Sequence, residues 1–130
     1  MRLGKHRRER NGERGQATVE LALVLPLAVL FALVTLQLGI LAKDVVLVHH
    51  AAREGARAAA VEPTGGAARA AVVGSSSLES GRLNVSLSGG TARGSQTTAT
   101  VTYRAPTSVP LVGALIPDVT LEASVTMRVE

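Results

Sequence analysis

The stretch Arg14-Gly15-Gln16-Ala17-Thr18-Val19-Glu20 joins a basic leader to a long apolar segment and places a carboxylate at its entrance. Residues 21–42 carry no charge, and 14 of these 22 residues are Leu, Val, Ile or Phe. A helix of this length measures about 33 Å, close to the roughly 30 Å hydrocarbon core of a bilayer. The sequence therefore predicts one membrane crossing, with residues 16–42 as the transmembrane helix. A cleaved secretory signal fits less well, because its apolar region spans only about 7–15 residues.

The charges on either side of this segment predict its orientation. Residues 1–15 hold six cations against two carboxylates, whereas the 15 residues after Ala42 hold three cations. Because the more positive flank stays in the cytoplasm, residues 1–15 are predicted to be a basic cytoplasmic leader and residues 43–130 an extracytoplasmic domain. We therefore expect a single-pass protein of the cytoplasmic membrane, in contact with membrane lipid.

Composition argues against several classes of function. Residues 43–130 carry eight cations against seven anions, so the basic character belongs to the leader, and the only aromatic residues are Phe31 and Tyr103. A solvated tail is thus favoured over nucleic-acid binding. The chain lacks cysteine, and the adjacent His49 and His50 point about 100° apart on a helix, so no metal site is predicted. Without a catalytic or phosphate-loop motif, we expect no enzyme, no cofactor and no small-molecule substrate.

Glu20 needs an explanation of its own. An acidic side chain within a membrane segment costs roughly 2.5–3.5 kcal/mol on insertion scales, which makes Glu20 a candidate functional residue. It could equally lie at the interface, near the helix start, where the helix dipole stabilises an anion. The physical argument leaves both interpretations open.

The helical pattern continues beyond the apolar segment. It stops at Glu62-Pro63-Thr64-Gly65-Gly66, a run of helix breakers, so we predict one helix from about Ala17 to about Val61, with Pro26 as a site for a kink. Its outer half, residues 43–61, has small residues at three-to-four spacing: Val48, Ala52, Gly55 and Ala59. This stripe predicts close packing against a sheet or a second helix.

The remaining chain predicts a short helix and three strands. The helix is expected over residues 67–80, and apolar and polar residues alternate over residues 82–88, 97–104 and 119–129. The fold class is therefore α+β, with the long N-terminal helix packed on a small three-stranded antiparallel sheet. The connection over residues 105–118 contains an apolar run that either covers the sheet edge, which we favour, or forms an exposed partner surface.

Two linked motifs add a family resemblance. The first is Gly15 followed by Val19-Glu20-Leu21-Ala22-Leu23-Val24-Leu25-Pro26, and the second is Ala51-Ala52-Arg53-Glu54-Gly55-Ala56-Arg57-Ala58-Ala59-Ala60. Together they resemble the TadE-like family, minor pilins or pseudopilins of the tight-adherence (Tad, Flp-type) type IV pilus system. The resemblance covers residues 15–61, and it implies a pilin-like outer domain. The chain beyond Val61 matches only in general pattern.

The resemblance implies specific roles for residues. A membrane prepilin peptidase would cut between Gly15 and Gln16, and Glu20 would pair with the new amine on Gln16 of the same or a neighbouring subunit, setting the register of assembly. Further partners would be other pilins and pilus-assembly platform proteins, and the protein could also occur outside the cell in a pilus. Gln16 departs from the Phe usual in the main type IV class, so N-methylation is not carried over. The family-motif segment comprises Ala52, Arg53, Glu54, Gly55, Ala56 and Arg57.

Within that segment, Glu54 and Arg57 are spaced to pair on the helix surface. A solvated helix face is favoured there over an assembly contact.

Three hypotheses of function remain. The leading hypothesis is a pilus-assembly protein processed at Gly15. The second is an unprocessed single-pass envelope protein whose outer domain binds a partner. The third is a nucleic-acid-binding protein that uses the basic leader, which predicts salt-sensitive binding.

Overall fold

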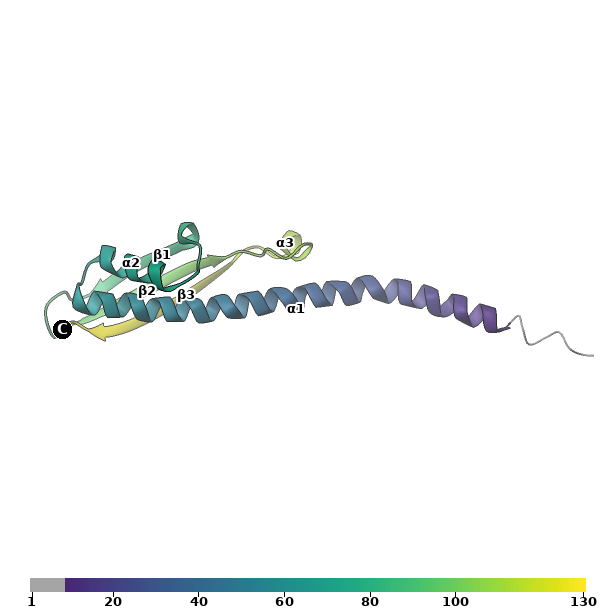
Figure 1. Cartoon of the computed structure of the whole chain (residues 1–130), viewed down its shortest axis with the longest axis horizontal. Coiled ribbons are helices and arrows are strands. Elements are labelled where there is room, and N and C mark those ends of the chain that lie inside the picture. Colours follow the sequence, from purple (N-terminus) through teal and green to yellow (C-terminus); the bar gives the residue numbers. More distant parts are fainter. Residues whose placement is uncertain (1–8) are drawn as a thin grey trace, which may run out of the picture.

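The computed structural model describes the backbone of residues 9–130 and side chains from Gly15 onward. Most of the predicted leader, residues 1–15, therefore lies outside the described part. The elements are α1 (Glu9–Val61), α2 (Gly65–Ser75), a 3₁₀ turn η1 (Ser80–Arg82), β1 (Leu83–Gly89), β2 (Gln96–Ala105), α3 (Val112–Leu115) and β3 (Val119–Arg128) (Figure 1). The fold is α+β, as the sequence predicts.

α1 is one helix of 53 residues that forms the long axis of the molecule (Figure 1). It ends at Val61, as predicted, because Pro63 cannot continue a helix. The predicted start near Ala17 is wrong, because the helix begins at Glu9. Most residues from 9 to 16 have adequate helix propensity, and each Gly lowers helix stability by only about 1 kcal/mol relative to Ala. Pro26 lies inside α1, yet the ribbon curves gently and shows no sharp kink.

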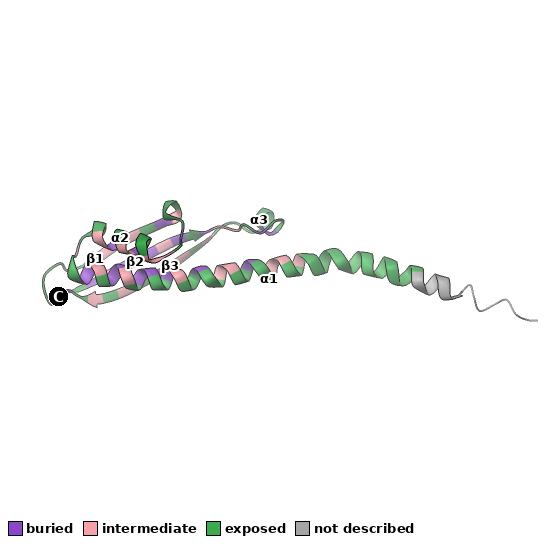
Figure 2. Cartoon of the chain, viewed as in Figure 1, coloured by how far each residue is buried: buried purple, intermediate pink, exposed green. Residues whose placement is uncertain are grey.

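Among the described residues, α1 is the one helix long and apolar enough to cross a membrane. Its most apolar 18-residue window has a mean hydropathy of 2.5, and none of that window is buried in the structure. Figure 2 shows the contrast along the helix: residues 15–29 are exposed throughout, whereas the part beside the domain alternates buried and exposed residues.

The sheet is antiparallel with strand order β1-β2-β3. Its strands begin and end within one residue of the predicted bounds. In the observed register Val85 pairs with Val101, which pairs with Ala123, so that the alternating apolar residues share one face. A shift of one residue would turn this face to water, which is why the pattern fixes the register.

α2 differs from the prediction of a helix over residues 67–80. It spans Gly65–Ser75, because the Thr64 hydroxyl accepts a hydrogen bond from the Ala67 amide and caps the helix start. The helix ends where the hydroxyls of Ser75 and Ser76 both bond to the Val72 carbonyl. Side-chain hydrogen bonds of this kind compete with continued helix.

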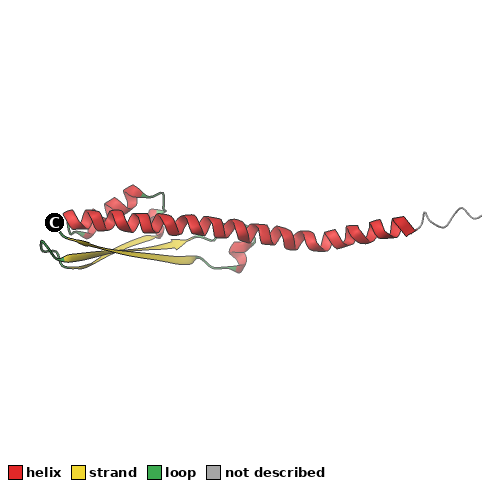
Figure 3. Ribbon diagram, turned by 90° about the horizontal axis from the view of Figure 1, so that it is seen from below, coloured by secondary structure: helices red, strands yellow, loops and turns green. Residues whose placement is uncertain are grey.

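α1 and α2 both pack against the apolar face of the sheet, and α1 lies along the sheet (Figure 3). All four residues of the predicted stripe, Val48, Ala52, Gly55 and Ala59, are buried. The core cluster continues through Val72 and Leu78 to the inner face of the sheet at Leu83, Val101, Tyr103, Ala105 and Ala123. The helix-to-sheet packing predicted from the stripe is confirmed.

Candidate functional site

The predicted processing bond lies within α1, in its exposed half. Gly15 and Gln16 are exposed, as is every residue from 15 to 29. A Cβ added at Gly15 would meet no atom of the described chain within 4 Å. Nothing in the described part of the chain therefore requires glycine at position 15 for packing.

Glu20 lies one helical turn beyond Gln16, about 6 Å along the axis at roughly 1.5 Å per residue. Glu20 is exposed and forms no ion pair with another described side chain. The structure thus leaves this carboxylate available for a group on another molecule or for the membrane interface.

The family-motif segment divides into a buried and an exposed side. Ala52, Gly55 and Ala56 are buried, whereas Arg53 and Arg57 are exposed. A Cβ on Gly55 would lie 2.7 Å from Val72 Cγ2 in α2 and 3.7 Å from Ala99 Cβ in β2. The small residues of the motif therefore allow α1 to approach both neighbours closely.

The two charged residues predicted to pair on this helix do not do so. Glu54 is half-buried and Arg57 is exposed, and the described chain shows no ion pair between them. The motif's arginines thus point to solvent in this single chain.

Comparison with known proteins points to the same part of the chain, from the predicted processing bond to the family-motif segment. The model of the family described as TadE-like protein matches residues 15–57, which begin at Gly15 and end at Arg57. This segment is similar to the TadE-like family. The matched segment contains the first motif quoted from the sequence, and the second motif as far as Arg57. No curated protein and no solved structure shows significant similarity to the chain.

Gln37, inside the TadE-like segment, is a contact residue that the sequence reasoning missed. It is 9% exposed although it lies in the apolar run. Its Oε1 accepts a hydrogen bond of 3.2 Å from the Val109 amide, and its Nε2 donates to the Pro106 carbonyl at 3.4 Å. Gln37 thus holds the β2–β3 loop (residues 106–118) against α1. The available signal was a polar side chain within the apolar run, but the sequence does not indicate which group it bonds to.

This loop corrects the favoured interpretation of the 105–118 connection. The loop does not lie over the sheet edge: it extends past the end of the sheet and carries α3 along α1 (Figures 1 and 3). Val109 and Val112 are buried, but Leu111, Leu115 and Ile116 are 63%, 71% and 42% exposed.

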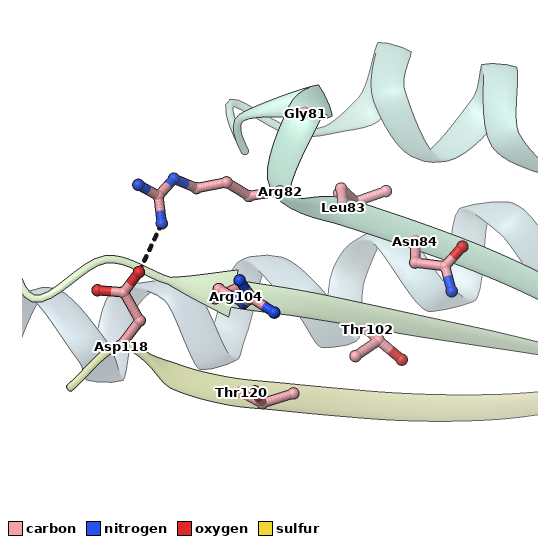
Figure 4. A pocket seen from close by; sticks show the side chains of 8 residues that line it. All are labelled: Gly81, Arg82, Leu83, Asn84, Thr102, Arg104, Asp118 and Thr120. Atoms are coloured by element: carbon pink, nitrogen blue, oxygen red, sulfur yellow. Dashed lines mark hydrogen bonds and ion pairs between the residues drawn. The ribbon is translucent and has the colours of Figure 1, made fainter.

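The base of the loop is closed by an ion pair on the open side of the sheet (Figure 4). The Arg82 guanidinium donates to Asp118 Oδ2 at 2.8 Å, and the Thr107 amide donates to Asp118 Oδ1 at 3.1 Å. The amide of Thr107, and then Arg82, lower the pKa of Asp118 below its usual range. The hydrogen bond to Asp118 in turn raises the pKa of Arg82.

A shallow hollow of about 630 Å³ lies beside this pair. Its lining is Gly81, Arg82, Leu83, Asn84, Thr102, Arg104, Asp118 and Thr120 (Figure 4). The one carboxylate among them is already bonded to Arg82 and Thr107. The lining offers neither a nucleophile beside a base nor a set of metal ligands.

The histidines form no metal centre with other described residues, among which no group of three or more His, Cys, Asp or Glu is close enough to bind an ion. His49 and His50 are exposed, and His49 Nδ1 lies 2.9 Å from the Val45 carbonyl oxygen.

Proposed function

We propose that the chain is a minor pilin or pseudopilin that takes part in assembly of a Tad pilus, and that a prepilin peptidase removes its leader between Gly15 and Gln16. The observation that carries this proposal is the TadE-like match, whose first residue is Gly15. The exposure of residues 15–29 supports it, because a peptidase and later a neighbouring subunit both need access to this part of α1.

In the proposed arrangement α1 crosses the cytoplasmic membrane once. The basic leader stays in the cytoplasm and the sheet domain lies outside, as the positive flank predicts. The large side chains of the inner half of α1, such as Leu23 at 72% exposure and Leu27 at 67%, then contact lipid. After assembly the same surface would contact other pilins.

Glu20 acts in this proposal as the residue that sets register. Cleavage creates an amine on Gln16, and a carboxylate in an apolar environment is less costly when such a cation lies beside it. Glu20 forms no ion pair within the described chain, so it is available for the amine of a neighbouring subunit. The Arg53 and Arg57 side chains are exposed and would face partners at a different level of the assembly.

The proposal is tested by the N-terminus of the mature protein. The full chain is expressed with its cognate peptidase, extracted from membranes and analysed by mass spectrometry as wild type, Gly15→Ala and Gly39→Ala. Both glycines are exposed on α1 and neither has an atom within 4 Å of an added Cβ, so both variants should fold. We expect a terminus at Gln16 in wild type and Gly39→Ala, and an intact leader in Gly15→Ala.

An uncut leader in all three proteins would overturn the processing step. The chain would then be a single-pass envelope protein whose outer domain binds a partner. Cleavage of Gly15→Ala at the wild-type rate would show that the peptidase does not read this glycine.

The role of Glu20 is tested with the charge-neutral variant Glu20→Gln. We expect this variant to be cut normally but to be lost from pili isolated from the cell surface. Glu54→Gln is the matched control, because Glu54 is a carboxylate on the same helix outside the membrane segment. Incorporation of Glu20→Gln at the wild-type level would remove Glu20 from the assembly contact while leaving the processing result intact.

A further inference from the structure

The β2–β3 loop lies beside a part of α1 that the sequence places in the membrane. Gln37, which holds the loop, is five residues before Ala42, about 7.5 Å along the helix axis at roughly 1.5 Å per residue. Between residues 15 and 43, the residues of α1 that are not exposed share one face at three-to-four spacing: Leu30, Leu33, Val34, Gln37, Ile40 and Leu41. In Figures 1 and 3 the loop with α3 runs along this part of α1. Whatever surrounds α1 at this level must therefore also surround the loop.

The tip of the loop (residues 109–116) has the composition of a lipid-contacting segment. It contains no charged or hydrogen-bonding side chain. Two of its apolar side chains, Val109 and Val112, pack inward, while Leu111, Leu115 and Ile116 project from the chain. The tip therefore exposes apolar side chains beside α1, which α3 contacts.

The backbone at Leu111 gives a second, independent indication. Leu111 has a φ of 68°, and it is the only residue other than glycine with a positive φ in the described chain. Glycine would adopt this conformation without strain, whereas a leucine there is disfavoured. Leucine is 63% exposed here, so its side chain gains little packing within the chain to offset the strain. An apolar surface outside the chain would supply that gain.

Part of the loop's backbone needs no water as a hydrogen-bond partner. Pro106, Pro110 and Pro117 have no amide hydrogen. The amides of Thr107, Val109, Gly113 and Ile116 are hydrogen-bonded within the chain, to Asp118, Gln37, Val109 and Val112 respectively. Satisfied backbone groups lower the cost of leaving water.

We propose that the tip of the β2–β3 loop inserts into the outer leaflet of the membrane, at the boundary between headgroups and acyl chains, beside α1. Irregular backbone is not tolerated deep in hydrocarbon, so Gln37 marks the interface and the hydrocarbon core falls on roughly residues 17–36, about 30 Å of helix. Arg104, exposed just before the loop, and the Arg82–Asp118 pair at its base then lie in the headgroup layer. The domain is thereby fixed to the membrane at a second point.

This inference rests on the proposed membrane crossing of α1 but not on processing or pilus assembly. It is tested with the full chain in vesicles of phosphatidylethanolamine and phosphatidylglycerol, at about one protein per vesicle. The chain has no cysteine, so a single environment-sensitive NBD label can be placed by Leu115→Cys or Leu111→Cys in the tip, Leu23→Cys in the span and Ser86→Cys on the exposed sheet face. Quenching is measured with aqueous iodide and with lipids that carry a nitroxide near the headgroup or deep in the acyl chain.

We expect both tip labels to be shielded from iodide and quenched most by the shallow nitroxide. The label at position 23 should be quenched most by the deep nitroxide, and the label at position 86 by iodide. Tip labels as sensitive to iodide as position 86, with position 23 in lipid, would overturn the loop proposal alone. Iodide quenching at position 23 as well would overturn the membrane crossing. Tip labels that become shielded only when protein density is raised would assign the tip to a second copy of the chain instead of lipid.

Discussion

The two halves of α1 use apolar side chains in opposite ways. In the inner half, residues 15–29, large side chains such as Leu23 and Leu27 are all exposed. In the outer half, residues 43–61, the buried side chains include five alanines and Val48, and Gly55 is buried as well. Small residues allow the domain to approach the helix, whereas large ones provide a surface for molecules outside the chain. The difference shows that apolar content alone does not predict which half is covered by the protein.

The largest effect is expected where the outer half is packed most closely. Gly55→Leu should lower the free energy of unfolding by about 3 kcal/mol, because overpacking forces neighbouring elements apart. Even a Cβ would lie 2.7 Å from Val72 Cγ2 and 3.7 Å from Ala99 Cβ. Thermal unfolding of the full chain in detergent, followed by circular dichroism, measures the change.

Gly39→Ala is the matched control, at an exposed glycine of the same helix outside the packed outer half. No atom of the described chain lies within 4 Å of an added Cβ there, so the free energy of unfolding should be unchanged or slightly higher.

The contact between Gly55 and Val72 can be tested with a double variant. Gly55→Ala combined with Val72→Ala should lower the free energy of unfolding by less than the sum of the two single effects, because the two residues touch. A Gly55→Leu protein as stable as wild type would mean that α1 and α2 are not held this closely.

The fold was largely predictable because its signals are local and periodic. The period-two pattern around Val85, Val101 and Ala123 fixes both the strands and their register, and Pro63 marks the end of α1. The start of α2 was not predictable from the same rules. Two glycines after Pro63 indicate a break, but the hydroxyl of Thr64 caps a helix that begins at those glycines.

The candidate site divides in the same way. The processing motif lies within six residues of the sequence and includes Gly15, Gln16 and Glu20. Its predicted partners are other molecules, so the structure of one chain shows only that these residues are exposed. The contact of Gln37 with Pro106 and Val109 joins residues 69 and 72 positions apart. No local pattern encodes such a pairing, since it depends on how far the β2–β3 loop extends past the sheet.

Gln37 lies between the two halves, and its removal should give an intermediate effect. Gln37→Leu keeps the size of the side chain but leaves the buried Val109 amide without its acceptor, at an expected cost of about 1–3 kcal/mol. Hydrogen exchange of the Val109 amide measures the loss of this hydrogen bond directly. Exchange should become faster at Val109 and in the rest of the loop tip. Leu38→Ala is the control, because Leu38 is 59% exposed on the same helix and should leave exchange at Val109 unchanged. Equal exchange in Gln37→Leu and wild type would show that the loop is held by its apolar contacts instead.

The smallest effect is expected at Asp118, where the loop rejoins the sheet. Its pKa is lowered in the folded chain by the Thr107 amide and then by Arg82, so the ionised carboxylate contributes stability at neutral pH. That contribution begins to be lost as the pH falls below about 4, the usual pKa of Asp, and is gone once the pH has passed the lowered pKa of Asp118 in the folded chain. Asp118→Asn should therefore unfold slightly more easily than wild type at pH 7, and the difference should shrink at pH 3. Glu122→Gln is the control on the strand that follows Asp118, since Glu122 is exposed and forms no ion pair within the described chain. A difference between wild type and Asp118→Asn that stayed constant with pH would assign the effect to packing at the loop base. Because this ion pair is partly exposed to water, it can close the loop without stabilising it strongly, and the position of the tip then depends on Gln37 and on the surroundings of α1.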